Sequence, residues 1–331
     1  MKNILNKLFD HQTLNYDEAK NILIEIGEGK HQAMQIASFL TVFCMRSLSV
    51  AELEGFRDAM LQLCRKINLS DFNTIDIVGT GGDGKDTFNI STLASFVTAG
   101  AGIKVAKHGN YGVSSSCGSS NVLEYLNVPF TNDESKLQLM LDKSGFCMMH
   151  APLFHPAMAN VAPIRKGMEV RTFFNVLGPI VNPSSPKNQL LGVFNLELAR
   201  LYGYLQQKTS NNYKIVHSVD GYDEISLTAS VKILSNKGET LLEPTDLGFP
   251  QCKQEDLHGG GSIQDSAKIF VNILENKGTT AQTNAVLANA GLAIQTVEST
   301  LSLSDAMAKA KESLVSGAGL KVLKTLQALN S

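Results

Sequence analysis

Four glycines and two aspartates follow a short apolar run in the segment DIVGTGGDGKDTFNIST, residues 76–92. Gly81, Gly82 and Gly84 let the backbone take positive φ angles and approach a ligand closely. The exposed N–H groups of such a loop, ahead of a helix beginning near Ser91, favour an anion. Phosphate or pyrophosphate is the expected occupant. The loop is not a P-loop, because no Gly-Lys-Ser/Thr ends it, and its spacing breaks the dinucleotide fingerprint. A purely structural glycine-rich turn is the alternative.

Asp83 and Ser91 refine this hypothesis. A carboxylate repels a bare phosphate, so Asp83 indicates a hydroxyl-bearing ligand such as a ribose, or a metal ion. The alternative is an Asx contact that stabilises the turn. Ser91 either caps the following helix or supplies its hydroxyl oxygen to Mg²⁺.

A second glycine-rich loop, KHGNYGVSSSCGSSN at 107–121, follows another apolar run. Its lysine, glycines and five serines are what a flexible lid over phosphate oxygens needs, although an ordinary mobile linker has a similar composition. Arg165, in a segment (155–183) that predicts two short helices, can pair bidentately with a carboxylate; most helical arginines are surface cations. The adjacent acids Asp223 and Glu224 at a strand end predict a hard-cation site, or else a solvated turn.

The surrounding pattern predicts how these residues are positioned. Helical periodicity covers the first 66 residues, with capping boxes at Asn15–Glu18 and Ser49–Glu52. From residue 75 the runs IDIVG, KVAKHG, FCMMHAP, LLGVFN and KIVHSV alternate with helical patterns, which predicts an α/β fold with a mostly parallel sheet. Ligands bind such sheets at the carboxyl ends of the strands. The stretch 236–261 is turn-rich, and we expect helices at 264–276, 280–296, 303–315 and 318–329.

Composition narrows the function classes. The 331 residues carry 29 basic and 31 acidic side chains, a net charge of −2, so no general attraction to nucleic acid or anionic membrane is expected. The start of the chain lacks the apolar core of a signal peptide and no run is long enough to span a bilayer, which predicts a cytoplasmic location. The five scattered cysteines favour buried or incidental thiols over a metal or disulfide role.

Six motifs in order resemble the anthranilate phosphoribosyltransferase family over nearly the whole chain: G-T-G-G-D at 79–83, N-I-S-T at 89–92, K-H-G-N at 107–110, A-P-I-R at 162–165, F-N-x-L-G-P at 174–179 and D-G-x-D-E at 220–224. The resemblance implies an enzyme of tryptophan biosynthesis that transfers the 5-phosphoribosyl group of phosphoribosyl pyrophosphate (PRPP) to the amino group of anthranilate and releases pyrophosphate. It also implies Mg²⁺, with two ions expected. Departure of pyrophosphate leaves positive charge on the ribose, so stabilising the leaving anion and positioning a weak amine nucleophile suffice.

The resemblance also implies site residues. Residues expected to contact PRPP are Gly79, Gly82, Asp83, Thr87, Asn89, Ile90, Ser91, Thr92, Lys107, His108, Gly109, Asn110, Tyr111, Gly112, Val113, Ser114, Ser115 and Ser119. Residues expected to hold anthranilate are Gly79, Asn110 and Arg165, and those expected to bind magnesium are Ser91, Asp223 and Glu224. No catalytic residue is assigned, although His108 is a candidate for handling a proton or for orienting a substrate; packing beside the loop is its alternative role.

The chain departs from the family pattern at three places. Tyr111 stands where many relatives have arginine, Gly-Ser-Ser-Asn at 118–121 replaces G-S-A-D, and Asn160 replaces a frequent histidine. We interpret these as variation within the activity. Two alternatives remain: a nucleoside phosphorylase of the same fold, expected to differ in the second loop, and a non-catalytic nucleic-acid-binding relative, expected to be basic.

The expected architecture is a small helical domain, residues 1–69, completed by helices within 155–183, and a larger α/β domain, residues 70–331. The resemblance places the active site in the cleft between them and implies a homodimer formed through the helical domain. Its partners would be PRPP and anthranilate, with no nucleic acid and no membrane.

Overall fold

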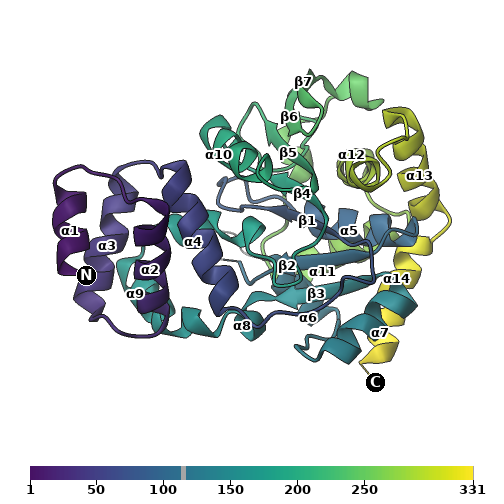
Figure 1. Ribbon diagram of the computed structural model, residues 1–331. Coiled ribbons are helices and arrows are strands. Elements are labelled where there is room, and N and C mark those ends of the chain that lie inside the picture. The colour runs from purple at the N-terminus through teal and green to yellow at the C-terminus, as the bar shows by residue number, and fades with distance from the viewer. Residues whose placement is uncertain (113–116, 331) are drawn as a thin grey trace. The chain divides into compact units, whose positions relative to one another are not determined.

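The computed structural model describes residues 1–112 and 117–330 (Figure 1). Val113, Ser114 and Ser115, three of the expected PRPP contacts, lie outside the described residues. Internal contacts divide the chain into two compact units. Unit 1 comprises Met1–Ile67 and Ala151–Ser185, and unit 2 comprises Asn68–His150 and Pro186–Ser331.

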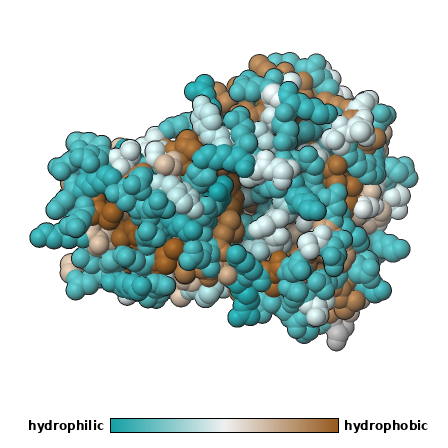
Figure 2. Space-filling view, viewed as in Figure 1, coloured by the Kyte–Doolittle hydropathy of each residue, from teal (hydrophilic) through white to brown (hydrophobic). Residues whose placement is uncertain are grey.

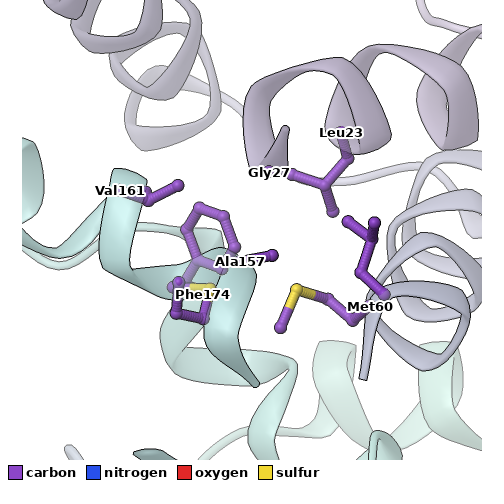
Figure 3. Close-up of a pocket in the computed structure, with 8 residues that line it drawn as sticks. Leu23, Gly27, Met60, Ala157, Val161 and Phe174 are labelled. Atoms are coloured by element: carbon purple, nitrogen blue, oxygen red, sulfur yellow. The ribbon is translucent and has the colours of Figure 1, made fainter. Parts of the chain in front are cut away.

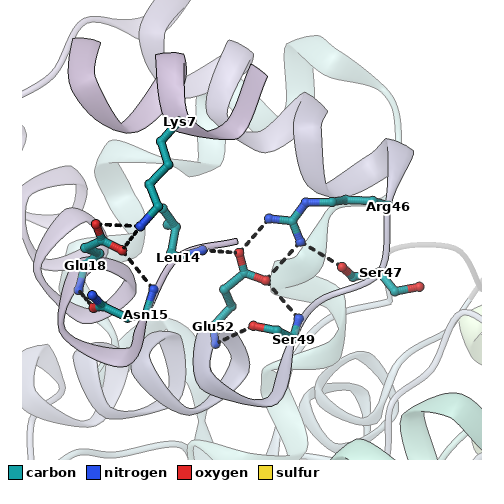
Figure 4. Close-up of polar contacts among 8 residues, drawn as sticks. All are labelled: Lys7, Leu14, Asn15, Glu18, Arg46, Ser47, Ser49 and Glu52. Carbon is teal, nitrogen blue, oxygen red and sulfur yellow. Dashed lines mark hydrogen bonds and ion pairs between the residues drawn. The ribbon is translucent and has the colours of Figure 1, made fainter. Parts of the chain in front are cut away.

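The first part of unit 1 is a bundle of helices, as the periodicity predicts. Its helices are α1 (Lys2–Phe9), α2 (Tyr16–Gly27), α3 (Ala33–Met45) and α4 (Val50–Leu63). Both predicted capping boxes are present, at Asn15 with Glu18 and at Ser49 with Glu52 (Figure 4). In each, the side chain of the cap accepts a backbone N–H three residues later, which satisfies a donor that the helix leaves open.

One capping residue, Glu52, is fully buried and joins several parts of the bundle. Its carboxylate accepts from the backbone N–H groups of Leu14 (2.9 Å) and Ser49 (2.8 Å) and from the Arg46 guanidinium (2.6 Å) (Figure 4). Burial raises the pKa of Glu52, but Arg46 and the two N–H groups more than offset this and hold it below its ordinary value. A buried carboxylate is tolerated when it is paired and hydrogen-bonded in this way.

The second part of unit 1 differs from the prediction of two short helices. It consists of α8 (Ala151–Phe154), a 3₁₀ turn (Pro156–Asn160), α9 (Ala162–Met168) and two further 3₁₀ turns (Phe173–Val176, Gly178–Ile180). Prolines near the start of three of these pieces lack the N–H that a helix interior needs, so the chain begins a new turn at each. Phe173 stacks on Phe56 of α4, with ring centroids 4.4 Å apart, and so packs this segment on the bundle.

Unit 2 is built on a sheet whose described strands run in the order β3-β2-β1-β4-β5-β6-β7. The strands are β1 (Ile75–Gly79), β2 (Val105–Gly109), β3 (Phe146–His150), β4 (Asn188–Gly192), β5 (Asn212–Ser218), β6 (Val231–Ser235) and β7 (Gly238–Leu242). The first five in spatial order are parallel, and β6 and β7 are antiparallel. The predicted mostly parallel α/β sheet is therefore confirmed. The β6–β7 hairpin was not predicted, because β7 is an edge strand with mostly exposed residues.

The connections reverse direction in the middle of the sheet. From β1 the chain passes through α5 (Ile90–Gly100) to β2 on one side, whereas from β4 it passes through α10 (Leu196–Gln206) to β5 on the other. Because such crossovers are right-handed, α5 and α10 cover opposite faces (Figure 1). The carboxyl ends of β1 and β4 thus form a topological switch point, where open α/β sheets bind ligands.

The remaining α-helices of unit 2 confirm the four expected C-terminal helices. They are α6 (Ser119–Tyr125), α7 (Glu134–Ser144), α11 (Ile263–Leu274), α12 (Thr280–Val297), α13 (Leu303–Val315) and α14 (Ala318–Leu329). Hydrophilic residues cover much of the face in Figure 2, interrupted by hydrophobic ones. Within the described part of the chain, no helix combines the length and apolar character needed to cross a membrane.

Candidate active site

Asp223 lies over the carboxyl ends of β1 and β4. Gly79 and Gly192 face each other as the last residues of these paired strands. A Cβ atom on Gly79 would meet the Asp223 carboxylate, and one on Gly192 would meet the Asp223 carbonyl oxygen. The Asp223 side chain is buried, and its Oδ2 accepts from the Gly81 N–H at 2.6 Å. The two strand-end glycines therefore make room for a carboxylate at the switch point.

Glu224 reaches the first turn of α5. Its Oε1 accepts from the backbone N–H of Ser91 at 2.9 Å, and the Ser91 hydroxyl also hydrogen-bonds this carboxylate. The N-cap of α5 is Asn89, so the alternative in which Ser91 caps this helix is wrong. The open N–H groups and the positive end of the helix dipole stabilise a negative charge here.

Asp223, which is buried, and Glu224, which is partly buried, create a region of negative potential. Burial, followed by repulsion from Asp83, raises the pKa of Asp223 to about 7. Burial, followed by repulsion from Asp223, raises the pKa of Glu224 to about 8. The Gly81 and Ser91 N–H groups oppose these shifts without cancelling them. A cation between the carboxylates would interact favourably with both charges and lower both pKa values.

Asp83 stabilises its own turn and also reaches the acidic pair. Its Oδ1 accepts from the Lys85 N–H at 3.1 Å, which is the Asx contact, and its side chain also hydrogen-bonds Asp223. The neighbouring glycines 81, 82 and 84 have φ values of 66°, 75° and 75°, which confirms the expected left-handed backbone of this loop. The turn thus brings a third carboxylate to the acidic pair.

The donor set suits Mg²⁺, which takes hard oxygen ligands. No group of three or more His, Cys, Asp or Glu side chains within residues 1–112 and 117–330 forms a complete metal site. Mg²⁺ commonly uses one or two carboxylates and completes its shell with waters and substrate phosphate oxygens. Asp223, Glu224 and the hydroxyl of Ser91 could supply the protein's share of such a shell.

The second glycine-rich loop is tied to the first. Asn89 Nδ2 donates to the carbonyl of Cys117 at 3.0 Å, which connects the start of α5 with the loop that follows β2. The Asn110 carbonyl accepts from the Ser119 hydroxyl (3.3 Å) and the Ser120 N–H (3.1 Å). A Cβ on Gly109 would meet the Ser119 hydroxyl. The structure thus brings Asn89, Gly109, Asn110 and Ser119 together.

Lys107 and His108 lie inside the protein. The Lys107 ammonium donates to the Ile77 carbonyl, and burial lowers its pKa although Asp76, Glu224 and Asp223 oppose that shift. His108 is 3% exposed, and its backbone N–H donates to Asp76 Oδ1 at 3.0 Å. Asp76 is not among the site residues predicted from the sequence. Its signal was an acidic residue inside the otherwise apolar run IDIVG.

Other expected PRPP contacts have varied surroundings. Ile90 and Thr92 are buried in α5, whereas Thr87 forms an isolated bridge with His258. Tyr111 is 38% exposed, and its hydroxyl donates to Glu124 Oε1 at 3.2 Å.

All five cysteine thiols of the chain lie in its described part and are free of disulfides.

Arg165 belongs to unit 1, whereas the other expected anthranilate contacts, Gly79 and Asn110, belong to unit 2. Its guanidinium donates to Asn175 Oδ1 at 3.2 Å and lies over the Phe174 ring, 5.2 Å from the centroid. Burial lowers its pKa. The F-N-x-L-G-P motif therefore orients this arginine, through one hydrogen bond and one cation–π contact.

Phe174 also lines an apolar pocket within unit 1 (Figure 3). Its lining residues are Leu23, Gly27, Met60, Leu63, Ala157, Met158, Val161 and Phe174. The pocket has no room for a water-sized sphere. It is therefore a small packing gap, and we assign it no ligand.

Comparison with known protein families gives two matches. Residues 2–64 match the helical bundle domain of a glycosyl transferase family, and residues 71–320 match the a/b domain of such a family. The chain is 62% identical over 330 residues to the anthranilate phosphoribosyltransferase of Flavobacterium psychrophilum, with all of both chains covered. It is 57% identical to that of Christiangramia forsetii, covering 100% of this chain and 99% of that one.

Solved structures agree with these matches. The crystal structure of anthranilate phosphoribosyltransferase from Thermus thermophilus has a TM-score of 0.91 at 31% identity, covering 98% of each chain. The Saccharomyces cerevisiae enzyme in complex with PRPP and Mg has a TM-score of 0.91 at 26% identity, covering 98% of this chain and 96% of that one. The same yeast enzyme with 4-fluoroanthranilate has a TM-score of 0.88 at 26% identity and the same coverage.

Proposed function

The chain belongs to the anthranilate phosphoribosyltransferase family, and we propose that its acidic pair Asp223 and Glu224 serves the reaction of that family. PRPP transfers its 5-phosphoribosyl group to the amino group of anthranilate, which gives N-(5-phosphoribosyl)anthranilate and pyrophosphate. This is the second step of tryptophan biosynthesis from chorismate. The observation that carries the proposal is the pair Asp223 and Glu224, held beside a glycine loop and a helix N-terminus at the switch point.

The PRPP site is assigned to the loops at the carboxyl ends of β1 and β2. The left-handed glycines of the first loop present backbone N–H groups that can donate to phosphate oxygens. Asp83 is suited to accept from a ribose hydroxyl. Asn110 and Ser119 extend the same site into the second loop.

Asp223, Glu224 and Ser91 are the proposed magnesium ligands. When bound, Mg²⁺ stabilises the negative charge of the departing pyrophosphate. The Gly81 N–H orients the Asp223 carboxylate, and the Ser91 N–H orients that of Glu224. We propose two ions, because the two acids are held at different points, Asp223 by Gly81 of the first loop and Glu224 by Ser91 of α5, and a pyrophosphate has enough oxygens to bind two ions.

Arg165, Asn110 and Gly79 are the proposed anthranilate contacts. The Arg165 guanidinium is already oriented by Asn175 and Phe174, and its charge suits the anthranilate carboxylate. A strongly activated base is not needed, since anthranilate attacks with a neutral amine. His108 stays a candidate for a role in orientation, because its backbone is fixed by Asp76.

We further propose a homodimer that associates through the helical bundle. Met34 and Met45 of α3 and Phe9 of α1 are large hydrophobic side chains of this bundle, and they are 77%, 83% and 58% exposed. Sedimentation at micromolar concentration should give a dimer. A Met34→Lys/Met45→Lys variant should shift it toward monomer, and a wild-type protein that stays monomeric would exclude this assembly.

The activity test follows anthranilate fluorescence after mixing the protein with PRPP and Mg²⁺. We expect a loss of fluorescence that stops when a chelator is added and resumes with excess Mg²⁺. Parallel reactions with nucleosides and phosphate test the phosphorylase alternative. Folded protein that leaves anthranilate unchanged but cleaves a nucleoside would overturn the proposal.

A further inference from the structure

Asn121, the third residue of α6, accepts two backbone hydrogen bonds with one oxygen. Its Oδ1 lies 2.9 Å from the N of Gly112 and 3.0 Å from the N of Gly118. Gly118 is the N-cap of α6, so the second bond satisfies an open donor at a helix start. The first bond crosses the loop, because Gly112 lies before the loop's middle residues and Asn121 lies after them. Asn121 therefore joins Gly112 on one side of the loop to Gly118 on the other.

The backbones of these two positions are in direct contact. A Cβ on Gly118 would meet the Gly112 N, would lie 2.6 Å from the Tyr111 carbonyl carbon, and would lie 2.8 Å from the Gly112 Cα. Only glycine allows this approach. The N–H of Ser120, the residue before Asn121, donates to the Asn110 carbonyl at 3.1 Å. The loop therefore has a narrow closed base, which we call the loop stem (residues 110–112 and 118–121).

The loop stem is anchored to the end of β3. His150 is the last residue of that strand, and its ring makes a T-shaped contact with the Tyr111 ring, with centroids 4.9 Å apart. Its Nδ1 is 2.8 Å from the Ser120 hydroxyl, and its ring stacks on Phe130 at 4.7 Å. Both sides of the stem thus contact one buried residue. The Asn121 side chain hydrogen-bonds the backbone of both sides at once.

We propose that Asn121 is a positioning residue for PRPP: by joining the two sides of the loop stem, it holds Asn110 and Ser119 in place to bind. The inference rests on the proposed function, since it requires that Asn110 and Ser119 contact PRPP. A carboxamide oxygen has two lone pairs and can satisfy two N–H donors.

Steady-state kinetics of two Asn121 variants tests this role. Each neutral hydrogen bond shifts an equilibrium by about two- to tenfold, so losing both in Asn121→Ala should raise the KM for PRPP about tenfold or more. The kcat should change less than threefold and the KM for anthranilate less than twofold. Asn121→Asp keeps the acceptor oxygen and should return the KM for PRPP to within threefold of wild type.

Asn195→Ala is the matched control. Asn195 is the N-cap of α10, and its side chain accepts from the Leu198 N–H at 2.8 Å, so the variant loses a comparable cap away from the loop. It should lower the melting temperature and leave every KM unchanged.

The outcomes separate this inference from the proposed function. Active wild-type enzyme with an unchanged KM for PRPP in Asn121→Ala would overturn the inference alone, and so would failure of Asn121→Asp to restore binding. Wild-type protein that does not consume anthranilate would overturn both. A rise in the KM for PRPP alone in Asn121→Ala, together with a near-wild-type KM in Asn121→Asp, would support the positioning role.

Discussion

Replacing Gly79 by alanine should displace the Asp223 carboxylate without unfolding the protein. Gly79 has no left-handed φ, so alanine introduces no backbone strain there. Its Cβ, however, would meet Asp223 Oδ2 and lie 3.0 Å from Cγ, whereas ordinary contacts lie at 3.4–4 Å. The Asp223 carbonyl packs against Gly192, so the side chain must move instead.

The structure sets the size of the effect. The displaced carboxylate would lose or weaken its 2.6 Å hydrogen bond from the Gly81 N–H. A hydrogen bond to a charged group contributes about 1.5–3 kcal/mol, and each 1.4 kcal/mol corresponds to about tenfold in rate. We therefore expect kcat/KM at limiting Mg²⁺ to fall about 10- to 100-fold. The magnesium concentration for half-maximal rate should rise. Overpacking should cost about 1–3 kcal/mol of stability.

The assay is a magnesium titration of the initial rate, followed by anthranilate fluorescence, with circular dichroism to confirm folding. Gly203→Ala is the matched control. Gly203 lies in the middle of α10, and a Cβ atom there would be at an ordinary contact distance of 3.5 Å from the Leu234 side chain. That variant should keep wild-type kinetics and gain up to about 1 kcal/mol of stability. Folded Gly79→Ala protein with a wild-type rate and magnesium dependence would refute the assignment of Asp223 to the metal.

Three further predictions concern unit 1. The Arg46→Ala variant leaves the Glu52 carboxylate buried without its cation, so the free energy of unfolding measured in urea should fall by about 3 kcal/mol. A loss below about 0.5 kcal/mol would contradict a stabilising Arg46–Glu52 ion pair. Burial lowers the pKa of His155 to about 4 from an unfolded value near 6.5, so the unfolded state binds the proton first as the pH falls. The free energy of unfolding should therefore fall by about 2 kcal/mol between pH 7 and pH 5. The His155→Gln variant should not show this fall, whereas the control variant His11→Gln, at an exposed site, should show it in full. Equal pH profiles for the wild type and both variants would contradict the prediction. Arg165→Ala should raise the KM for anthranilate at least tenfold with little change for PRPP, and Arg165→Lys should be intermediate because lysine lacks the planar fork; equal rises for both substrates would contradict the assigned role.

Elements with strong local signals could be predicted from the sequence. The capping boxes at Asn15 and Ser49, the five parallel strands and the four C-terminal helices all depend on residue type and periodicity over short stretches. The left-handed glycines of the first loop were predictable for the same reason. Short-range pattern thus gave the fold class and located the loops.

Features that depend on contacts distant in the sequence could not be predicted. Asp223 meets Gly79 across more than 140 residues, and only the order of strands brings them together. Asp76 and the double acceptor role of Asn121 depend likewise on the packing of neighbouring segments. The β6–β7 hairpin was missed because an exposed edge strand has little hydrophobic alternation.

The central claim is phosphoribosyl transfer to anthranilate at a magnesium site formed by Asp223 and Glu224. It is tested most directly by quantifying both products of the wild-type protein and the Asp223→Asn/Glu224→Gln double variant, with mass spectrometry for the nucleotide and an enzymatic assay for pyrophosphate. We predict one pyrophosphate released for each anthranilate converted to its N-(5-phosphoribosyl) derivative, and a loss of both products in the folded variant. Pyrophosphate release without the adduct, or full activity in the variant, would contradict the account.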